Sequence, residues 1–524
     1  MTAVPASPYR THAAGTLNRE HAGQTVTVAG WVQTIRRFRR QSFVELREAS
    51  GLLQLVVPAD LAEGLTEEST LQAQGQVAVR HAAHPHLASY PTGEVELQVQ
   101  RLELLGKAGA LPFARHETPS EAEMLRHRTL ALRWPAHQSP LVQRARIVKA
   151  MRQVAEQHGF LEVETPVLVR NTPGGATPFL VPVGEGKGYA LAQSPQVWKQ
   201  LLVCGGIERY YQLAHCFRNE GARPERQPEF SQFEIEMAFS SAGQVQAVME
   251  GMVQAAATAA GKALPAVFPR STYLEAMARF GSDKPHAGNP LRLEGPVATV
   301  HTRFERGEVS LTLPRPLTRT EQAVWLREAW ERVEEWGEVR LLRGDQSLVI
   351  VGPRERAQAA MGALRTGIAE AWGLVEPGLF PVWVEQFPLW EQTETGAWAS
   401  AHHPFTRPLA GHTAWEAPET MLGEAFDLAI NGQEIGGGSM RIHEPAQQRQ
   451  VFALLGWGQE ESEAHFQPLL EALSLGAPPH GGMALGVERL VATLLNLPHI
   501  RAAMAFPKTS GGQCLLTGAL AALE

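Results

Sequence analysis

His215–Glu236 has the sequence HCFRNEGARPERQPEFSQFEIE and lies between two apolar segments. Residues 210–214 precede its charged loop, and residues 230–236 follow that loop with apolar and polar side chains in alternation. A period of two on both sides of a charged loop is typical of two antiparallel strands. The sequence therefore predicts a β-hairpin whose loop is dense in arginine and glutamate.

The charged side chains of this hairpin fall on matching faces. Arg218 and Glu220 are two positions apart, as are Glu234 and Glu236, and such spacing places each pair on one face of a strand. Cations and carboxylates on one sheet face suit a site for a polyphosphate, its metal ion and an amine. From this stretch alone, a solvated hairpin is the alternative.

Length and composition indicate a multidomain protein of ordinary polarity. The 524 residues suffice for two to four domains, and 44% are hydrophobic while 19% are charged. The net charge of −7 gives no overall attraction for a polyanion, so any nucleic-acid partner needs a local patch. Three cysteines without metal-type spacing argue against a disulfide scaffold or a cysteine zinc site, and they suit a reducing cytoplasm. We expect neither a signal peptide nor a membrane span.

The N-terminal residues are typical of a small closed barrel. Five short alternating segments predict its strands: 24–32, 42–47, 52–57, 76–80 and 94–99. Between the first two lies the basic run Arg36–Arg40, and Phe43 follows it. Cations for phosphate and a ring for base stacking are what a single-stranded nucleic-acid site requires. A solvated hairpin tip is the alternative for this run.

A proline- and histidine-rich hinge at 107–140 precedes a unit with mixed helices and strands. Residues 141–155 have helical spacing, and 160–166 read as a strand. Ser194 and Pro195 predict a helix start with serine as the cap, and Gln196 and Lys199 then share a helix face. Alone, that pair would be surface decoration.

Residues 287–377 change in composition and predict an inserted α+β module, after which a second set of motifs follows. His402 and His403 are adjacent, so on a strand they would point apart, and no third ligand stands at a useful spacing for a metal. Asn431-Gly432 predicts a hairpin turn. The returning strand contains Gly436–Gly438, which predicts a ligand against its backbone, flanked by Glu434 and Arg441.

The last motif, Pro478–Val491, passes from a glycine-rich strand directly into an amphipathic helix that carries Arg489. The backbone at the glycines of this strand can approach a planar nucleotide closely, while Arg489 reaches the phosphate of that nucleotide. Neither a Walker A loop nor a dinucleotide fingerprint is present, so ATP would bind on an antiparallel sheet.

Together these motifs resemble the class II aminoacyl-tRNA synthetases. Phe160–Pro166, Phe217–Glu236 and Gly481–Leu490 are similar to the three signatures of that class. Shorter motifs resemble the bacterial-type aspartyl-tRNA synthetase family, and the resemblance extends over nearly the whole chain. These motifs include residues 193–196, 226–230, 402–406 and 506–509. The resemblance implies an α+β protein and a homodimer whose interface includes Pro166. The implied domains are an OB-fold anticodon-binding domain (1–106), a hinge (107–140), a class II catalytic domain (141–286 and 378–524) and an inserted module (287–377).

The resemblance also implies an aspartate–tRNA ligase that uses ATP and Mg²⁺ to form aspartyl-adenylate and then charges tRNA-Asp. Arg218 would stabilise the transition state at the α-phosphate. The implied ATP-binding residues are Arg218, Glu220, Gln227, Glu434 and Arg489. All of these except Gln227 are also the implied catalytic residues, and Glu434 would hold the metal.

The implied aspartate-binding residues are Gln196, Lys199, Arg218, Glu234, His402, His403 and Arg441. Lys199 and Arg441 would pair with the side-chain carboxylate of aspartate, for which an arginine can be bidentate. Glu234 would contact the ammonium group, and His403 or His402 would close over the substrate. In the barrel, the implied anticodon-binding residues are Arg36, Phe43, Gln54 and Glu94.

The sequence departs from the family at the amino-acid site. Gly174 stands where the family has a glutamate near the substrate ammonium, and Glu234 stands where it has aspartate. Losing one such carboxylate is expected to weaken amino-acid binding by about 1–3 kcal/mol. Asn219 and Gly221 replace acidic residues, residues 130–134 replace an arginine-rich hinge sequence, and the insertion is short.

These departures leave two further hypotheses. One is a diverged synthetase paralogue that activates another amino acid or acceptor, or that binds tRNA with little charging activity. The other is an amide-forming asparagine synthetase, which is weaker because such relatives normally lack the barrel.

Overall fold

The structure is a computed structural model that describes residues 7–80, 91–173, 175–221, 225–299, 302–333, 335, 337–342, 346–393 and 395–520. Gly174 lies outside these residues. The chain divides into two compact units, Met1–Pro119 and Ser120–Glu524, and the division falls inside the predicted hinge. Among the described helices, none has the length and apolar character needed to span a membrane.

The first unit is a closed five-stranded barrel, which confirms the prediction. Its strand order is β1-β2-β3-β5-β4. Alternate residues of each strand fill the interior, where Val28, Val44 and Leu55 are fully buried. The strands are β1 (Thr25–Arg37), β2 (Gln41–Glu48), β3 (Gly51–Pro58), β4 (Thr70–Val79) and β5 (Val95–Gly106), with short 3₁₀ helices η1 (Ala14–Thr16), η2 (Arg19–His21) and η4 (Pro91–Glu94).

The second unit is built on an eight-stranded sheet in the order β12-β17-β20-β21-β22-β11-β10-β6. The predicted hairpin is confirmed as its antiparallel β10–β11 pair, in which Gln212 lies opposite Glu234. The predicted Asn431-Gly432 turn joins β20 to β21, and both turn residues have positive φ, as a tight hairpin requires. The strands are β6 (Leu161–Glu162), β10 (Arg209–Phe217), β11 (Glu229–Ala238), β12 (Arg270–Thr272), β17 (Pro381–Glu385), β20 (Ala425–Ile430), β21 (Gln433–Met440) and β22 (His480–Gly486).

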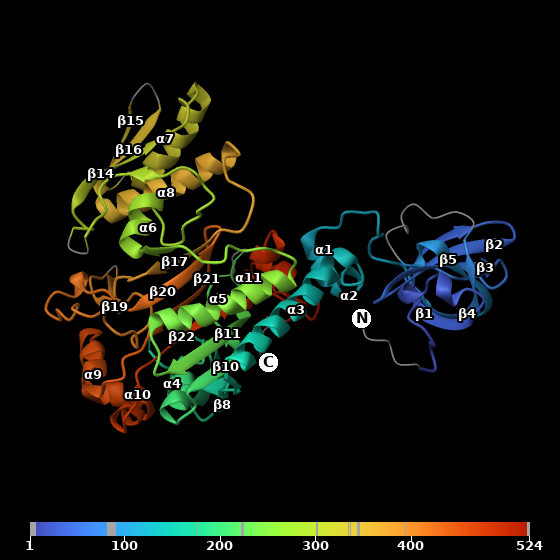
Figure 1. The fold of residues 1–524 in the computed structure, drawn as a ribbon, viewed down its shortest axis with the longest axis horizontal. Coiled ribbons are helices and arrows are strands. Elements are labelled where there is room, and N and C mark those ends of the chain that lie inside the picture. Colours follow the sequence, from blue (N-terminus) through green and yellow to red (C-terminus); the bar gives the residue numbers. More distant parts are fainter. Residues whose placement is uncertain are drawn as a thin grey trace. The chain divides into compact units, whose positions relative to one another are not determined.

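Three helices cover one face of this sheet and form the main core with it. The core joins Met151 of α3, Met252 of α5 and Leu490 of α11 to sheet residues such as Phe233 and Ile435. Figure 1 shows α3 and α5 side by side across the strands. The helices are α3 (Pro135–Gln157), α5 (Ala242–Ala259) and α11 (Val487–Leu495), followed by η6 (Ile500–Ala503).

Two short helices, α1 (Glu121–Arg126) and α2 (Arg128–Ala131), precede α3 inside the predicted hinge. The buried Arg128 donates from Nε to the carbonyl of Ala505 at 2.8 Å and from Nη2 to that of Met504 at 2.9 Å. Helix α3 begins at Pro135, before the expected residue 141, because proline at the first helical position needs no hydrogen-bond acceptor.

Residues between about 290 and 375 form a separate sheet with its own core. The order is β13-β14-β16-β15, and α7 and α8 pack on it (Figure 1). The module is held close to α6 (Tyr273–Phe280), because Gly281 and Gly362 meet backbone to backbone and a Cβ on either would clash. Its elements are β13 (Leu293–Glu294), β14 (Arg306–Thr312), α7 (Arg319–Val333), β15 (Glu338–Leu342), β16 (Ser347–Pro353) and α8 (Arg354–Ala371).

Smaller elements complete the walls of the second unit. They are β7 (Leu168–Val169), β8 (Leu180–Gly184), β9 (Lys187–Leu191), α4 (Gln196–Cys204), β18 (Trp390–Gln392), β19 (Trp398–Ser400), η5 (Pro418–Thr420), α9 (Pro445–Leu454) and α10 (Gln459–Ser474). The expected serine cap of α4 is wrong: Pro195 occupies the cap position, and no side chain caps the helix. The expected strand over 160–166 shrinks to the two residues of β6.

Candidate active site

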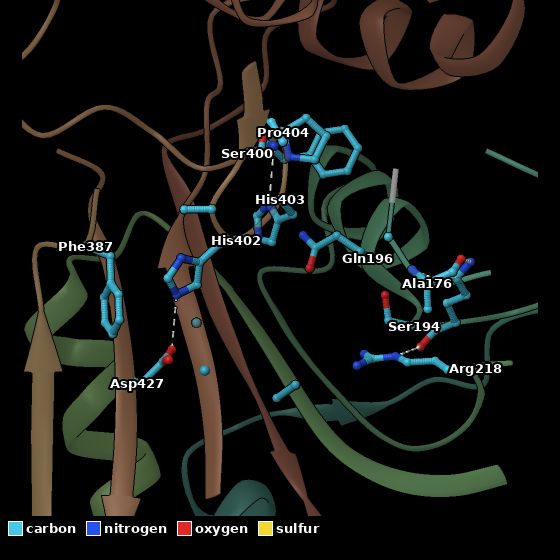
Figure 2. A pocket seen from close by; sticks show the side chains of 18 of the residues that line it. Ala176, Ser194, Gln196, Arg218, Phe387, Ser400, His402, His403, Pro404 and Asp427 are labelled. Carbon is cyan, nitrogen blue, oxygen red and sulfur yellow. Dashed lines mark hydrogen bonds and ion pairs between the residues drawn. The ribbon is translucent and has the colours of Figure 1, made fainter. Parts of the chain in front are cut away.

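One large cleft of about 1900 Å³ in the second unit gathers the residues singled out from the sequence. It is lined by every predicted ATP- and aspartate-binding residue: Gln196, Lys199, Arg218, Glu220, Gln227, Glu234, His402, His403, Glu434, Arg441 and Arg489. They come from α4, β11, β21 and the residue that follows it, α11 and two loops. Figure 2 shows His402 and His403 on one side of the pocket, with Gln196, Ser194 and Arg218 across from them.

Lys199, Glu234 and Arg441 of the cleft lining form a buried cluster of two cations and two carboxylates with Glu236. Lys199 Nζ is 2.7 Å from Glu234 Oε2 and 3.3 Å from Glu236 Oε2. Arg441 donates to both oxygens of Glu236, from Nε at 2.8 Å and from Nη2 at 3.0 Å. All four side chains are nearly inaccessible, so each charge depends on its partners. Burial alone would raise the pKa of Glu236, but Arg441 and Lys199 lower it to about 2.

Two residues of the predicted aspartate site each have a buried polar atom without a hydrogen-bond partner. These atoms are Glu234 Oε1, an acceptor, and Gln196 Nε2, a donor. Both side chains line the cleft. Buried polar groups are normally paired, so an unpaired acceptor and donor in one cleft are suited to a ligand that supplies the matching groups.

The two histidines have different environments. His403 Nε2 is 2.7 Å from Arg441 Nη1, and burial together with that guanidinium holds the pKa of His403 well below its usual value, so its ring is neutral. Burial also opposes the charged form of His402, but Asp427 at 3.3 Å outweighs it and raises the pKa of His402. They do not point apart as adjacent residues on a strand would, because both follow β19 in a loop and both line the cleft.

Arg218 and Glu220 lie beyond the end of β10, which stops at Phe217. The predicted shared strand face is therefore wrong for this pair, although both side chains line the cleft. The Arg218 guanidinium lies 5.2 Å from the centre of the Phe230 ring and donates to the carbonyl of Gln193 at 3.4 Å. Glu220 pairs with Arg226 at 2.7 Å.

Gln227 is engaged within the protein. Its Nε2 donates to the carbonyl of Lys508 at 3.1 Å, and its Oε1 accepts from the amide of Lys508 at 2.9 Å. Lys508 Nζ also pairs with Glu229 at 2.6 Å. These bonds fasten the loop between β10 and β11 to the C-terminal segment.

Glu434 is a partly exposed carboxylate of the cleft, and cations surround it. Arg489 donates to its backbone carbonyl at 2.5 Å, and its Oε1 lies 3.8 Å from the same guanidinium. Its Oε2 lies 3.7 Å from Lys284. No cluster of three or more His, Cys, Asp or Glu side chains in the described part of the chain could hold a metal ion alone. A half-exposed carboxylate is nevertheless a suitable ligand for Mg²⁺ that keeps waters and binds substrate phosphates.

The glycines of β21 are explained by the protein itself. A Cβ on Gly436 would overlap the carbonyl of Ala484, one on Gly438 that of Gly482, and one on Gly437 the Asp427 carboxylate. The prediction that these glycines make room for a ligand is thus incomplete, because strand packing already requires them. They also line the cleft.

Sequence reasoning missed several residues that line the cleft or contact its lining. Asp427 is a single charged residue in the otherwise apolar strand β20, and this pattern could have identified it as a site residue. Ser439 accepts from Arg441 Nη1 at 2.6 Å. Glu488 accepts from Arg144 at 2.8 Å and from the Ser231 amide at 3.0 Å, so it braces β11. Serine and a helix-borne glutamate carry no distinctive sequence pattern.

In the barrel unit, three of the four predicted anticodon-binding residues lie together. Arg36 and Phe43 are cross-strand partners, and Arg36 Nη2 lies 3.4 Å from Gln54 Oε1. Gln54 donates to Glu96 at 2.8 Å. Glu94 is exposed on η4 and pairs with Arg19 at 3.2 Å.

One member of the basic run has a structural role. Arg37 donates to the carbonyls of Ala62 and Leu65 at 3.0 and 2.6 Å, so it is not free for phosphate. Arg39 and Arg40 are exposed at the β1–β2 turn.

Comparison with protein families agrees with this architecture. Residues 120–510 match the model described as tRNA synthetases class II (D, K and N), and residues 26–105 match the OB-fold nucleic acid binding domain. The chain belongs to the class II tRNA synthetases of this group, which are ATP-dependent ligases.

Curated relatives narrow the resemblance. The chain is 38% identical to the aspartate–tRNA ligase of Xylella fastidiosa (strain M23) over 570 residues, covering 97% of this chain and 96% of the relative. It is also 38% identical to that of Stenotrophomonas maltophilia (strain K279a) over 564 residues, with the same coverage of both chains.

Solved structures share the fold. The asparaginyl-tRNA synthetase of Pyrococcus horikoshii in complex with asparaginyl-adenylate is 23% identical, with a TM-score of 0.63 over 94% of this chain and 96% of that one. A putative aspartyl-tRNA synthetase from Leishmania major Friedlin is 19% identical, with a TM-score of 0.65 over 97% and 96%.

Proposed function

We propose that this synthetase is an aspartate–tRNA ligase. The α-carboxylate of aspartate attacks the α-phosphate of ATP to give aspartyl-adenylate and pyrophosphate. The aspartyl group then passes to the 3′ end of tRNA-Asp, and AMP is released. The observation that carries this proposal is that the buried cations Lys199 and Arg441 line the same cleft as Arg218 and Arg489. The names of its 38%-identical relatives support the same substrate.

The proposed aspartate site follows from the buried cluster. The side-chain carboxylate of aspartate binds Lys199 and Arg441, and this arrangement requires Lys199 to share its charge between Glu234 and the ligand. Glu234 Oε1 is an unpaired acceptor suited to the α-ammonium group, and Gln196 Nε2 is an unpaired donor in the same cleft. Neutral His403, already bonded to Arg441, closes over the substrate.

The proposed ATP site uses the more open part of the cleft. Arg218 stabilises the charge that develops at the α-phosphate, and Arg489 binds the terminal phosphate. Glu220 contacts the nucleotide. Gln227 helps to position the nucleotide, because its hydrogen bonds to Lys508 fix the loop between β10 and β11. Glu434 would hold Mg²⁺, which would supply positive charge next to the phosphates of ATP.

For tRNA, we propose that the barrel reads the anticodon. Arg36 supplies a cation, Phe43 a stacking surface and Gln54 an amide at one edge of β1–β3. Glu94 completes the set from η4.

We also propose the domain limits given above, with residues 287–377 as an insertion into the catalytic domain.

A homodimer is supported by an apolar surface on the second unit. Leu161, Leu168, Leu180 and Val183 are 50–67% exposed, although large apolar side chains normally avoid water. They lie on β6, β7 and β8, and Pro166 is exposed between the first two of these strands.

Cysteines that are free throughout suit a cytoplasmic enzyme.

The test is aspartate-dependent exchange of pyrophosphate with ATP, followed by charging of tRNA-Asp. We expect both reactions with aspartate in preference to asparagine and glutamate. Absence of exchange with aspartate, under conditions where ATP binds, would refute the proposal.

A second candidate is a diverged paralogue that activates a different amino acid. Glu234 favours it, because the longer side chain reaches Lys199 at 2.7 Å and occupies the cation that a carboxylate substrate requires. Exchange with another amino acid but not with aspartate would establish this alternative.

A further inference from the structure

The inserted module contributes a wall of the cleft. Arg303, Phe304, Glu355 and Arg356 line it together with residues of the catalytic sheet. We infer that this wall is a binding platform for the unpaired 3′ end of the tRNA, with Phe304 stacking on a base and Arg356 holding a phosphate. The inference rests on the proposed function, and it assigns a role to the module.

Phe304 is held in an exposed position by the backbone around it. Its side chain is 54% exposed, yet the backbone on either side is fixed. The amide of Arg354 donates to the carbonyl of Glu305 at 2.9 Å, and the amide of Glu355 donates to that of Arg303 at 3.0 Å. The start of α8 therefore clamps the segment, so the ring is presented to the cleft at little cost in conformational entropy.

The charges around the ring favour an anionic, planar ligand. The Arg303 guanidinium lies 4.4 Å from the centre of the Phe304 ring, and its Nε has no hydrogen-bond partner although the side chain is only 4% exposed. The nearby carboxylate of Glu355 is engaged by Arg303 at 3.7 Å and by the Tyr273 hydroxyl. Arg356, in the first turn of α8, is exposed, and it forms no ion pair with the other residues that the structure describes.

An aromatic ring beside exposed and buried arginines is the combination that binds single-stranded nucleic acid. The unpaired 3′ end is the single-stranded part of the tRNA that must enter this cleft to reach the adenylate. The platform lies on the same cleft as Arg218, so a strand that stacks on Phe304 is already directed toward the reacting phosphate.

The test compares Phe304→Ala, Phe304→Tyr and Arg356→Ala with matched controls on α7. Trp330 is an exposed aromatic residue and Arg327 an exposed cation of the same module, and neither lines the cleft. We expect Phe304→Ala to lower kcat/KM for tRNA charging by about 5-fold to 150-fold, the value of one base–aromatic stack. Phe304→Tyr should keep the wild-type rate, Arg356→Ala should lower it, and Trp330→Ala and Arg327→Ala should not change it.

Two further measurements separate the platform from general damage and from the proposed function. Aspartate-dependent pyrophosphate exchange should be unchanged in Phe304→Ala, because adenylate formation needs no tRNA contact. The affinity of the wild-type protein for intact tRNA should exceed that for tRNA lacking its unpaired 3′ nucleotides, and Phe304→Ala should remove this difference. The binding comparison decides the matter even if the wild-type protein proves unable to charge tRNA-Asp. Normal charging by Phe304→Ala, or an undiminished preference for intact tRNA, would overturn the inference.

Discussion

Replacing Glu236 by glutamine should destabilise the catalytic unit and disable its amino-acid site together. Glu236 is fully buried and accepts both hydrogen bonds from Arg441, while Lys199 lies 3.3 Å away. Its pKa is lowered from 4.5 to about 2. At about 1.4 kcal/mol for each tenfold change in proton affinity, this corresponds to about 3 kcal/mol of stability. That figure agrees with the roughly 3–5 kcal/mol lost when one partner of a buried ion pair is removed.

The sign of the pH dependence follows from the direction of the pKa change. A carboxyl whose pKa is lower in the folded state stabilises the fold fully above its ordinary value, here 4.5. This contribution is lost as the pH falls from about 4.5 toward about 2. The difference in stability between wild type and Glu236→Gln should therefore be largest near neutral pH and shrink over that interval.

The assay is urea unfolding followed by tryptophan fluorescence at several pH values. Trp31 is the only one of the 12 tryptophans in Met1–Pro119, so the signal reports mainly on Ser120–Glu524. Glu185→Gln is the matched control, because the Glu185 side chain is 89% exposed. A Glu236→Gln protein as stable as wild type at neutral pH, or a difference independent of pH, would show that the cluster is not charged as described.

Three further predictions concern the reaction. Arg218→Ala should abolish pyrophosphate exchange yet leave tRNA affinity near normal, and equal loss of both would contradict the assignment of Arg218 to the α-phosphate. Phe43→Ala should weaken tRNA charging by about 5-fold to 150-fold through the lost stack and spare exchange, and a parallel fall in exchange would show that the barrel is not a separate tRNA reader. Gln227→Ala should raise KM for ATP more than KM for aspartate, because it releases the loop from Lys508. An unchanged KM for ATP would mean that these hydrogen bonds do not position the nucleotide.

Local sequence patterns were sufficient for much of the fold. The period of two around residues 210–236 predicted the hairpin correctly, and Asn431-Gly432 located a second one. Limits of elements were less accurate where the backbone changes direction. Arg218 falls just past the end of β10, because strand pairing stops at Phe217 and Glu229.

The internal pairing of the site could not be read from the sequence. Lys199 was expected to await a substrate carboxylate, but the structure pairs it with Glu234, 35 positions away. Such pairing depends on where α4 packs against β11, which is a matter of tertiary distance. Likewise, the hydrogen bonds of Gln227 to Lys508 join residues 281 positions apart.

The segment Met504–Lys508 has a consequence for any shortened form of this protein. Arg128 of α2 is anchored to its first residues, and Gln227 of the loop between β10 and β11 is anchored to its last. A stop codon just before Met504 would therefore remove only the last few per cent of the chain, yet it would release the start of the catalytic unit and the nucleotide loop at once.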